Sequence, residues 1–308
     1  MSTSDGITAI VAHDAGGAEI LASYVRRLPP GERERCVFAL EGPARKVFAR
    51  RLPGLDLLPL EEAVARADRL LCGTGWQSDF ELRAIALARS GGKPSVAFLD
   101  HWVNYRMRFI RGHETVLPDM LWVGDKMALP RARAELPEVP VQLVENPYFL
   151  DLRDMLARPT RHDAPHAGIN ALFLCEPVRE HALRQHGDER YWGYTEEGAM
   201  AYFLDHLDAL GAPVARIVVR PHPAEPPGKY DVMLRGYQLP IELSSAPDIL
   251  DDIRSADWVA GCNTMGLVIA LVAGRRALCC IPPGGRPCVL PHEGIVQLAA
   301  LLPKGAPR

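Results

Sequence analysis

Residues 216–223 read Arg-Ile-Val-Val-Arg-Pro-His-Pro, a short apolar run that passes directly into a proline-flanked histidine. A run of this length, bounded by polar residues and proline, predicts a buried β-strand. The run is apolar throughout rather than alternating, which is typical of a strand in a parallel sheet covered on both faces. The stretch therefore indicates an α/β fold, with a rigidly held histidine just beyond the carboxyl end of a strand.

The same pattern recurs along the whole chain. Short apolar strands are predicted at 7–12, 36–40, 69–72, 95–99 and 120–123, and again at 171–175, 216–219, 258–260 and 277–281. Helices are predicted between them, after Gly16-Gly17 through 20–25, and over 44–51, 78–89, 196–210 and 265–273. Alternation of buried strands and helices favours parallel sheets. A polar, proline-containing stretch at 158–166 has the composition of a linker. We therefore predict two Rossmann-like domains, residues 1–155 and 168–308, which face each other across a cleft.

Length and composition agree with this organisation. The chain has 308 residues, enough for about two domains of roughly 150 residues each. It is 48% hydrophobic and 24% charged, which excludes a largely disordered chain and a coiled coil. Its 35 basic and 38 acidic residues give a net charge of −3, so no general attraction to nucleic acid or to an anionic membrane is expected.

Cysteine usage and the amino terminus indicate an intracellular setting. The seven cysteines are odd in number, lie mostly in apolar runs and form no Cys-x-x-Cys motif, so we interpret them as reduced core thiols and expect no metal site. The first six residues carry no basic charge of the kind that begins a signal peptide. No run of about 18 apolar residues is present, so we expect a soluble cytoplasmic protein without a transmembrane segment.

Ligands of open parallel sheets bind at the carboxyl ends of the strands, so the residues just beyond each predicted strand are the first candidates for a site. The richest case is Arg220-Pro221-His222-Pro223. Arg220 is a permanent cation suited to a phosphate, and His222 can hydrogen-bond a phosphoryl oxygen or protonate a leaving phosphate. The alternative is a turn that carries a surface histidine.

A second candidate lies at Gly261-Cys262-Asn263-Thr264, which leads into the helix that begins at Met265. Asn263 or Thr264 at the helix N-cap would leave backbone N–H groups and the positive helix end free to hold a phosphate. Ordinary helix capping explains the same residues.

Two further candidates belong to the first half of the chain. In His13-Asp14-Ala15-Gly16-Gly17, the glycines permit a tight turn and close approach of a ligand, and Asp14 is a candidate general base with His13 as its partner. Asp14 could instead merely cap the following helix. The segment 99–106, Leu-Asp-His-Trp-Val-Asn-Tyr-Arg, places Asp100 beside aromatic side chains that suit a sugar face, or else in a structural ion pair with His101.

These residues resemble a known family. Two Rossmann-like halves, an Arg-Pro-His-Pro turn and a polar pair that caps a later helix look like glycosyltransferases of the GT-B fold. Among these, the chain is similar to metal-independent bacterial enzymes that build capsules and surface glycans, such as the sialyltransferases, the capsule Kdo-transferases and the CDP-glycerol polymerising transferases. That family pairs a His-Pro motif with a Ser-Ser/Thr motif on the donor phosphate; His222-Pro223 matches the first and Asn263-Thr264 approximates the second. The stretch 144–148 also resembles the end of the first domain in these folds and in the related nucleotide-sugar 2-epimerases.

The sequence departs from the family pattern at two places. The acidic motif of the sialyltransferases, two carboxylates and a glycine, is replaced at best by His13-Asp14-Ala15-Gly16, which has a single carboxylate. Many GT-B enzymes carry Glu-Ala within the later helix, with the glutamate on the donor ribose, whereas this chain has Ile269-Ala270. Recognition of the ribose must then come from elsewhere, or the donor is unusual.

The resemblance implies an inverting, metal-independent glycosyltransferase of polysaccharide biosynthesis, with a nucleotide-sugar as co-substrate and no cofactor. The donor phosphate would be held by Arg220, His222, Asn263 and Thr264, with His13, Gly16 and Gly17 forming a second ligand-binding loop. Asp14 would deprotonate the acceptor, a glycan or a lipid-linked acceptor, with Asp100 as the reserve base. We expect a CMP-activated acidic sugar, whose carboxylate Arg106 and Arg108 could meet.

Two other interpretations of the same fold stay open. One is a nucleotide-sugar hydrolase or 2-epimerase, which would release or convert the nucleotide-sugar without an acceptor. The other is a non-catalytic nucleotide-sugar-binding module of a glycan-assembly complex, which would be indifferent to loss of Asp14. Peripheral membrane contact and homo-oligomerisation are compatible with each of these interpretations.

Overall fold

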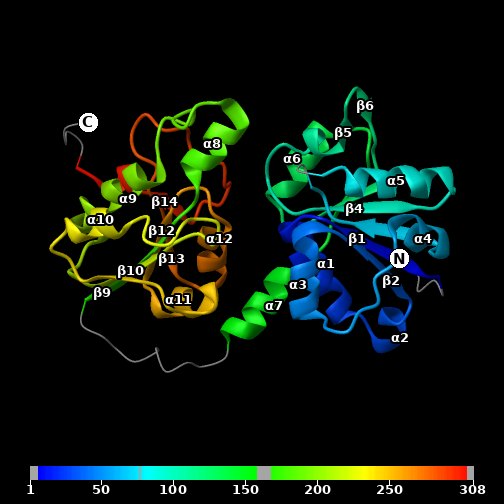
Figure 1. Ribbon diagram of the computed structural model, residues 1–308, viewed down its shortest axis with the longest axis horizontal. Coiled ribbons are helices and arrows are strands. Elements are labelled where there is room, and N and C mark those ends of the chain that lie inside the picture. Colours follow the sequence, from blue (N-terminus) through cyan, green and yellow to red (C-terminus); the bar gives the residue numbers. More distant parts are fainter. Residues whose placement is uncertain (1–5, 76–77, 158–167, 304–308) are drawn as a thin grey trace. The chain divides into compact units, whose positions relative to one another are not determined.

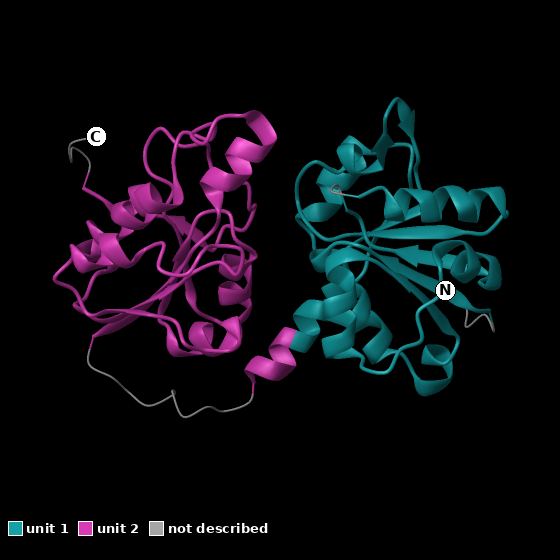
Figure 2. Ribbon diagram, in the orientation of Figure 1, with its two compact units in different colours: residues 1–151 teal, residues 152–308 magenta. Residues whose placement is uncertain are grey.

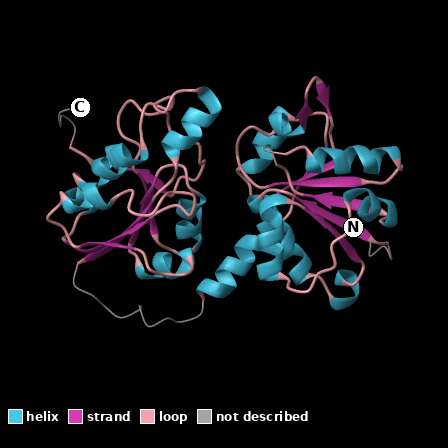
Figure 3. Cartoon of the chain, viewed as in Figure 1, coloured by secondary structure: helices cyan, strands magenta, loops and turns pink. Residues whose placement is uncertain are grey.

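The computed structural model describes residues 6–75, 78–157 and 168–303, which form two compact units, residues 1–151 and 152–308 (Figure 2). Each unit is built on a six-stranded parallel sheet with helices packed against it (Figure 3). The predicted α/β class with two Rossmann-like domains is therefore confirmed, and the cleft between them stays a prediction.

The first unit has the strand order β2-β1-β3-β4-β7-β8. Its sheet consists of β1 (Thr8–Ala12), β2 (Cys36–Leu40), β3 (Arg69–Cys72), β4 (Ser95–Leu99), β7 (Met120–Val123) and β8 (Val141–Leu143). Its helices are α1 (Ala15–Arg27), α2 (Pro30–Arg33), α3 (Gly42–Arg51), α4 (Leu60–Arg66), α5 (Phe80–Ser90), α6 (Ala128–Glu135) and α7 (Pro147–Leu156). A 3₁₀ turn, η1 (Arg106–Phe109), leads into a small antiparallel hairpin of β5 (Ile110–Arg111) and β6 (Glu114–Thr115).

The continuous apolar strands of this unit are explained by burial on both faces of the sheet. Ile10 and Ala12 belong to a core cluster that also contains residues of α1 and α3, while Ala9 and Val11, which point to the opposite face, are equally inaccessible to solvent. Helix α1 packs beside α3, and α4 packs beside α5 (Figure 1). Every position of β1 beyond Thr8 is thus removed from water, as the sequence pattern predicts.

The second unit has the strand order β11-β10-β9-β12-β13-β14. Its sheet consists of β9 (Ile169–Leu174), β10 (Val214–Arg220), β11 (Ile241–Leu243), β12 (Trp258–Gly261), β13 (Arg276–Cys279) and β14 (Ile295–Gln297). Its helical segments are α8 (Val178–His186), α9 (Glu196–Leu204), η2 (Leu207–Leu210), α10 (Asp231–Arg235), α11 (Ile249–Ser255), α12 (Met265–Val272) and α13 (Leu298–Leu301). No helix within the described ranges is both long and apolar enough to cross a bilayer.

The sequence analysis missed the two strands of the β5–β6 hairpin and three edge strands of the large sheets, and it merged two helical segments. Strands β8, β11 and β14 are three residues long and lie at sheet edges, where one-sided exposure interrupts the apolar run. The helix predicted over 196–210 is instead two segments, because α9 ends at Leu204 and the 3₁₀ helix η2 begins at Leu207.

The boundary between the units falls inside α7 rather than in the predicted linker. Asp151 is fully buried, and its carboxylate lies 2.7 Å from Arg26 Nη2, 2.8 Å from Arg27 Nε and 3.6 Å from Arg51 Nη1. These three cations hold the first half of α7 on unit 1, so unit 1 ends at Asp151 where the sequence analysis placed the limit at residue 155. The predicted linker at 158–166 lies outside the described residues.

Candidate functional site

The strand register of unit 2 brings several of the predicted residues to one edge of the sheet. Strands β10 and β12 lie on either side of β9, so the strand order reverses beside β9, which is where open α/β sheets bind their ligands. Arg220 pairs in register with Leu174, and Ala260 pairs with Phe173. Segments that leave three adjacent strands, about 4.8 Å apart, therefore emerge side by side.

Glu176 follows β9 at this reversal point, and the sequence analysis did not single it out. Its Oε2 accepts hydrogen bonds from the backbone N–H groups of Cys262 and Asn263, each at 2.9 Å. Burial raises the pKa of Glu176 to about 7; the two N–H donors lower it, and the charge of Glu225 raises it further. Glu176 therefore changes charge near neutral pH, directly before the amino-terminal end of α12. Its signal in the sequence is a glutamate immediately after the apolar run 171–175.

His222 lies in the turn after β10 with its ring oriented by local hydrogen bonds. Its Nδ1 accepts from the Ala224 N–H at 3.2 Å, and its own backbone N–H donates to Glu225 Oε2 at 2.8 Å. Partial burial lowers the pKa of His222, and the charge of Glu225 works in the opposite direction. The neutral ring with Nδ1 as acceptor carries its proton on Nε2, so His222 can donate a hydrogen bond to an anion.

The structure gives the Asn263-Thr264 pair two different roles. Thr264 is the N-cap of α12, where its Oγ1 accepts from the Gly266 N–H at 3.1 Å, so its hydroxyl proton can still be donated to a ligand. Asn263 connects two loops, because its Oδ1 accepts from the Val289 N–H at 2.9 Å and its Nδ2 donates to Tyr194 Oη at 3.3 Å. The side-chain atoms of Asn263 that were predicted to contact a phosphate thus hold two loops together at this edge of the sheet.

Arg220 is engaged by the protein itself. Its Nη1 donates to Asp252 Oδ2 at 2.6 Å, to the Ala246 carbonyl at 3.0 Å and to Ser244 Oγ at 3.1 Å. Asp252 supplies the negative charge that a phosphate was predicted to supply. Arg220 therefore braces the loop that follows β11, and its direct contact with a phosphate stays a prediction.

A buried ionic cluster is joined to the His222 turn through Glu225, and the sequence analysis did not predict it. Lys229 Nζ donates to Glu225 Oε1 at 3.0 Å, to Glu180 Oε1 at 3.1 Å and to Glu196 Oε1. Tyr230 Oη donates to the same oxygen of Glu225. The side chains of Glu225 and Glu196 are 0% and 2% exposed. Because Glu225 also accepts the His222 N–H, this cluster holds the turn in place.

In unit 1, His13 and Asp14 form a pair at the carboxyl end of β1. His13 Nδ1 lies 2.7 Å from Asp14 Oδ1, and the two side chains are 20% and 19% exposed. Asp14 occupies the N-cap position of α1, but its side chain makes no capping hydrogen bond. The alternative that Asp14 merely caps the helix is therefore not what the structure shows; its carboxylate is bound by an imidazole and remains accessible.

Glu81 in α5 supports this pair and is a further residue that the sequence analysis missed. Its Oε1 accepts the His13 N–H at 2.7 Å, and its side chain is buried. Burial raises the pKa of Glu81, the His13 N–H lowers it and the charge of Asp14 raises it. Glu81 Oε2 is buried without a hydrogen-bond partner among the described residues.

Asp100 forms an ion pair with Arg108, and this corrects the predicted use of two arginines. Arg108 is buried, and its Nη1 donates to Asp100 Oδ1 as well as to the Thr74 carbonyl at 2.9 Å. Arg106 binds both carboxylate oxygens of Glu138, at 2.6 and 2.8 Å. The prediction that Arg106 and Arg108 are available for a sugar carboxylate is therefore wrong, because protein carboxylates already neutralise both.

Gly16 and Gly17 are needed for close packing within the protein, and the approach of a ligand to them stays a prediction. A Cβ on Gly16 would collide with Asp100 Oδ2. A Cβ on Gly17 would lie 3.1 Å from the Gly73 Cα, tighter than an ordinary contact. The two glycines let the start of α1 approach the loops that follow β3 and β4, which brings Asp14 and Asp100 to one edge of the sheet.

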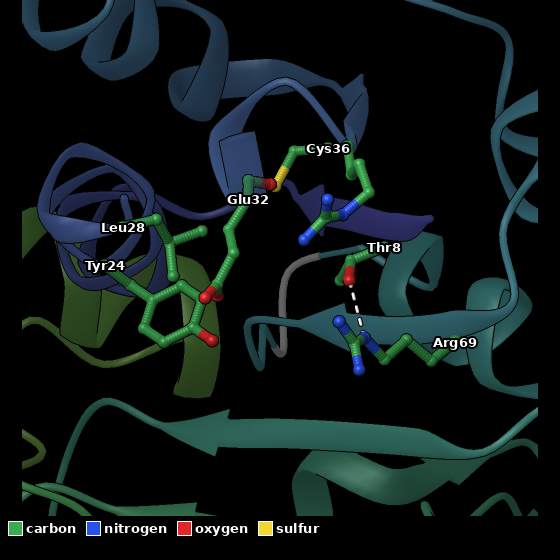
Figure 4. A pocket seen from close by; sticks show the side chains of 7 residues that line it. Thr8, Tyr24, Leu28, Glu32, Cys36 and Arg69 are labelled. Atoms are coloured by element: carbon green, nitrogen blue, oxygen red, sulfur yellow. Dashed lines mark hydrogen bonds between the residues drawn. The ribbon is translucent and has the colours of Figure 1, made fainter. Parts of the chain in front are cut away.

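A small pocket of about 20 Å³ lies at the opposite edge of the same sheet (Figure 4). Thr8, Cys36 and Arg69, the first residues of β1, β2 and β3, line it together with side chains of α1 and α2. Arg69 Nε donates to Thr8 Oγ1 at 2.7 Å across this pocket. The pocket is thus separated from Asp14 and Asp100, at the carboxyl edge of the sheet, by the length of the strands.

Comparison with known proteins shows what the architecture is. No protein-family model and no curated protein matches the chain. S. aureus MnaA, solved with UDP, superposes with a TM-score of 0.59 at 14% identity, covering 89% of this chain and 78% of that chain. UDP-GlcNAc 2-epimerase from Neisseria meningitidis bound to UDP-GlcNAc gives 0.56 at 11% identity, covering 88% and 81%. Acinetobacter baumannii MurG gives 0.53 at 10% identity, covering 96% and 87%.

The fold is GT-B-like. The matches extend over both units, and at these identities they are likenesses of fold alone. A GT-B-like chain carries two Rossmann-like units, in agreement with the sheet topology described above.

Proposed function

We propose that this GT-B-like protein is an inverting, metal-independent glycosyltransferase that uses a nucleotide-sugar donor. The observation that carries the proposal is the convergence of His222, Glu176 and Thr264 at the strand-order reversal of unit 2. These side chains offer an imidazole N–H, a carboxyl group that titrates near neutrality and a hydroxyl, all beside the positive end of α12. Hydrogen-bond donors at a helix amino terminus favour a phosphate.

The donor phosphates bind at this edge of unit 2, where His222 Nε2–H stabilises the charge that develops on the departing phosphate. Asp14 in unit 1 takes the proton from the acceptor hydroxyl as it attacks the anomeric carbon. Asp14 is favoured over Asp100 as the base because Asp100 is neutralised by Arg108, whereas Asp14 contacts a histidine and no arginine among the described residues. His13 positions the Asp14 carboxylate.

We favour a nucleoside diphosphate-sugar, in the first place a UDP-sugar, as the donor. Two of the similar structures were solved with UDP or UDP-GlcNAc. The CMP-activated acidic sugar expected from the sequence loses its support from Arg106 and Arg108, which bind Glu138 and Asp100. It is kept as the second donor class to be tested.

The proposal is tested by calorimetric titration of the protein with UMP, UDP, CMP, CDP and GDP, with and without EDTA. We expect one pyrimidine nucleotide to bind, EDTA to have no effect, and His222→Ala to weaken binding by about tenfold, the worth of one hydrogen bond to a charged group. His206→Ala is the matched control, because His206 lies between α9 and η2, where its Nδ1 bonds the Tyr202 carbonyl. Absence of binding by every nucleotide would refute the proposed function.

Glu176 provides a pH prediction for the same site. Because the pKa of Glu176 is about 7 rather than 4.5, its side chain is neutral at pH 5.5 and charged at pH 8.5. A charged carboxylate beside a bound phosphate repels it by a few kcal/mol at an effective dielectric constant of about 20. We therefore expect Glu176→Gln, which keeps an acceptor for both N–H groups, to bind the nucleotide about tenfold or more tightly than wild type at pH 8.5 and equally at pH 5.5.

Comparison of Glu176→Gln with wild type at each pH cancels the titration of the nucleotide itself. Weaker binding by Glu176→Gln at both pH values would contradict the prediction, and would make Glu176 a ligand of the substrate instead.

A nucleotide-sugar 2-epimerase is the second candidate function. It is favoured by the match to the Neisseria meningitidis 2-epimerase over 88% of this chain. Incubation of the protein with UDP-GlcNAc in the absence of an acceptor distinguishes the two: a 2-epimerase converts the sugar, and a hydrolase releases it, whereas a transferase leaves it unchanged. Nucleotide binding without turnover under any condition would favour a binding module.

A further inference from the structure

Arg286 lies in the loop between β13 and β14 and is held in a three-layer stack. Its guanidinium carbon lies 4.1 Å from the centroid of the Tyr191 ring, and the His186 ring stacks on Tyr191 at 3.5 Å with an interplanar angle of 16°. Two groups cannot cover the same ring face at these distances, so Tyr191 is sandwiched between them. The stack restricts the orientation of the Arg286 side chain before any ligand arrives.

This guanidinium is not neutralised by the protein. Arg286 is exposed, and within the described ranges it forms no ion pair and donates no side-chain hydrogen bond. Arg220 and Arg108, by contrast, each bind an aspartate at the carboxyl edge of their own sheet. Arg286 therefore retains its full set of donors for a partner outside the described chain.

Two segments connect Arg286 to the candidate site of unit 2. The Val289 N–H, three residues further along the loop, donates to Asn263 Oδ1 at 2.9 Å. The Arg286 N–H donates to the Trp192 carbonyl at 2.8 Å, and Tyr194, two residues beyond Trp192, accepts from Asn263 Nδ2 at 3.3 Å. Three residues of extended chain span about 10 Å, a distance that an arginine side chain and a nucleotide-sugar readily bridge.

We propose that Arg286 binds an oxyanion of the donor through a guanidinium whose donors are unused, in contrast to that of Arg220, which binds Asp252. The proposal rests on the proposed function and names a specificity-determining residue for it. A planar guanidinium that is held in place and has unused donors suits bidentate contact with a phosphate or carboxylate, and its loss of freedom on binding is small. The oxyanion is either the second phosphate of a nucleoside diphosphate or the carboxylate of an acidic sugar.

The test is calorimetric titration with UMP, UDP, UDP-glucose and UDP-glucuronic acid, and with CMP and CDP in parallel. We expect Arg286→Gln to weaken binding of the ligand that carries the recognised oxyanion by about 10- to 100-fold, the loss of a charge-assisted hydrogen-bonded pair. A loss for UDP with none for UMP assigns Arg286 to the second phosphate. A loss confined to UDP-glucuronic acid assigns it to a sugar carboxylate.

Two controls separate recognition from structure. Arg276→Gln removes another exposed arginine that lies over an aromatic ring, with its guanidinium carbon 5.2 Å from the centroid of the Trp258 ring, but at the opposite end of β13; it is expected to bind as wild type does. Tyr191→Phe keeps the stacked ring and is expected to bind normally, whereas Tyr191→Ala releases Arg286 and is expected to lose several-fold in affinity.

The outcomes for this inference and for the proposed function are distinct. Unchanged binding of every ligand by Arg286→Gln, with nucleotide binding intact in the wild type, would overturn the role of Arg286 and leave the proposed function standing. Failure of the wild type to bind any of the ligands would overturn both.

Discussion

Asp14→Asn is expected to lower the rate of sugar transfer by about 100- to 10,000-fold while leaving nucleotide binding unchanged. Asparagine can still accept the hydrogen bond from His13 Nδ1, whose distance to Asp14 Oδ1 is 2.7 Å, but it cannot take a proton from the acceptor hydroxyl. The rate loss should therefore appear in kcat rather than in the affinity for the donor. The measurement is steady-state transfer from the nucleotide-sugar identified by titration, together with the titration itself.

Asp100→Asn is the matched comparison, because Asp100 is the reserve base at the same edge of unit 1. Its loss leaves the buried guanidinium of Arg108, 8% exposed, without its carboxylate, so we expect lower stability but retained kcat in the folded fraction. The reverse result, with kcat kept in Asp14→Asn and lost in Asp100→Asn, would move the base to Asp100. Wild-type activity of both variants would show that neither aspartate is the base.

The fold could be predicted because its central strands are buried on both faces. Runs such as 9–12 and 217–219 contain no outward-facing polar position, and this pattern is typical of parallel sheets. The edge strands β8, β11 and β14 gave no such signal, since they are short and partly exposed. The end of unit 1 was also out of reach, because it depends on Asp151 meeting three arginines that lie 100 or more residues earlier in the chain.

The candidate site was predictable only in part, because the sequence does not give strand order or side-chain partners. His222 could be selected because it lies just beyond a strand, and Thr264 because it precedes a helix. That Arg220 binds Asp252, and that Arg108 binds Asp100, depends on tertiary contacts that local patterns do not contain. Glu176 could have been found by the rule that selected His222, since it too lies just beyond an apolar run, 171–175.

Lys229→Met is expected to destabilise unit 2 by about 3–5 kcal/mol, the usual result of removing one partner from a buried ion pair. The variant leaves Glu225 and Glu196, which are 0% and 2% exposed, without their shared cation.

The pH dependence of this stabilisation follows from the pKa of Lys229. Burial lowers the pKa of Lys229, but hydrogen bonds to Glu196, Glu225 and Glu180 raise it more, so the net pKa lies above its ordinary value. A lysine with a raised pKa stabilises the fold fully below its unfolded pKa of about 10.4, and this stabilisation is lost as pH rises through the folded value.

Urea denaturation of wild type and Lys229→Met at pH 7 and at pH 10 measures the effect. We expect the full difference at both pH values, because the lysine remains charged in the folded protein at each. Lys46→Met, which removes an exposed lysine from α3, should change the free energy of unfolding by less than about 0.5 kcal/mol. A small difference for Lys229→Met would show that Glu225 and Glu196 become protonated or hydrated at little cost.

The double variant Lys229→Met/Glu225→Gln separates the charge of this cluster from its support of the His222 turn. Glutamine is neutral, and its Oε1 can still accept the His222 N–H, which donates to Glu225 Oε2 at 2.8 Å in the wild type. If the cluster serves only to neutralise buried charge, the double variant should regain part of the lost stability and bind the nucleotide as wild type does.

If the turn needs the lysine and the glutamate together, the double variant regains stability but binds the nucleotide more weakly than wild type, because the position of His222 is then less well fixed. The second result is expected, since Lys229 connects Glu225 to Glu196 and Glu180 on neighbouring helices and thereby fixes the carboxylate that orients His222.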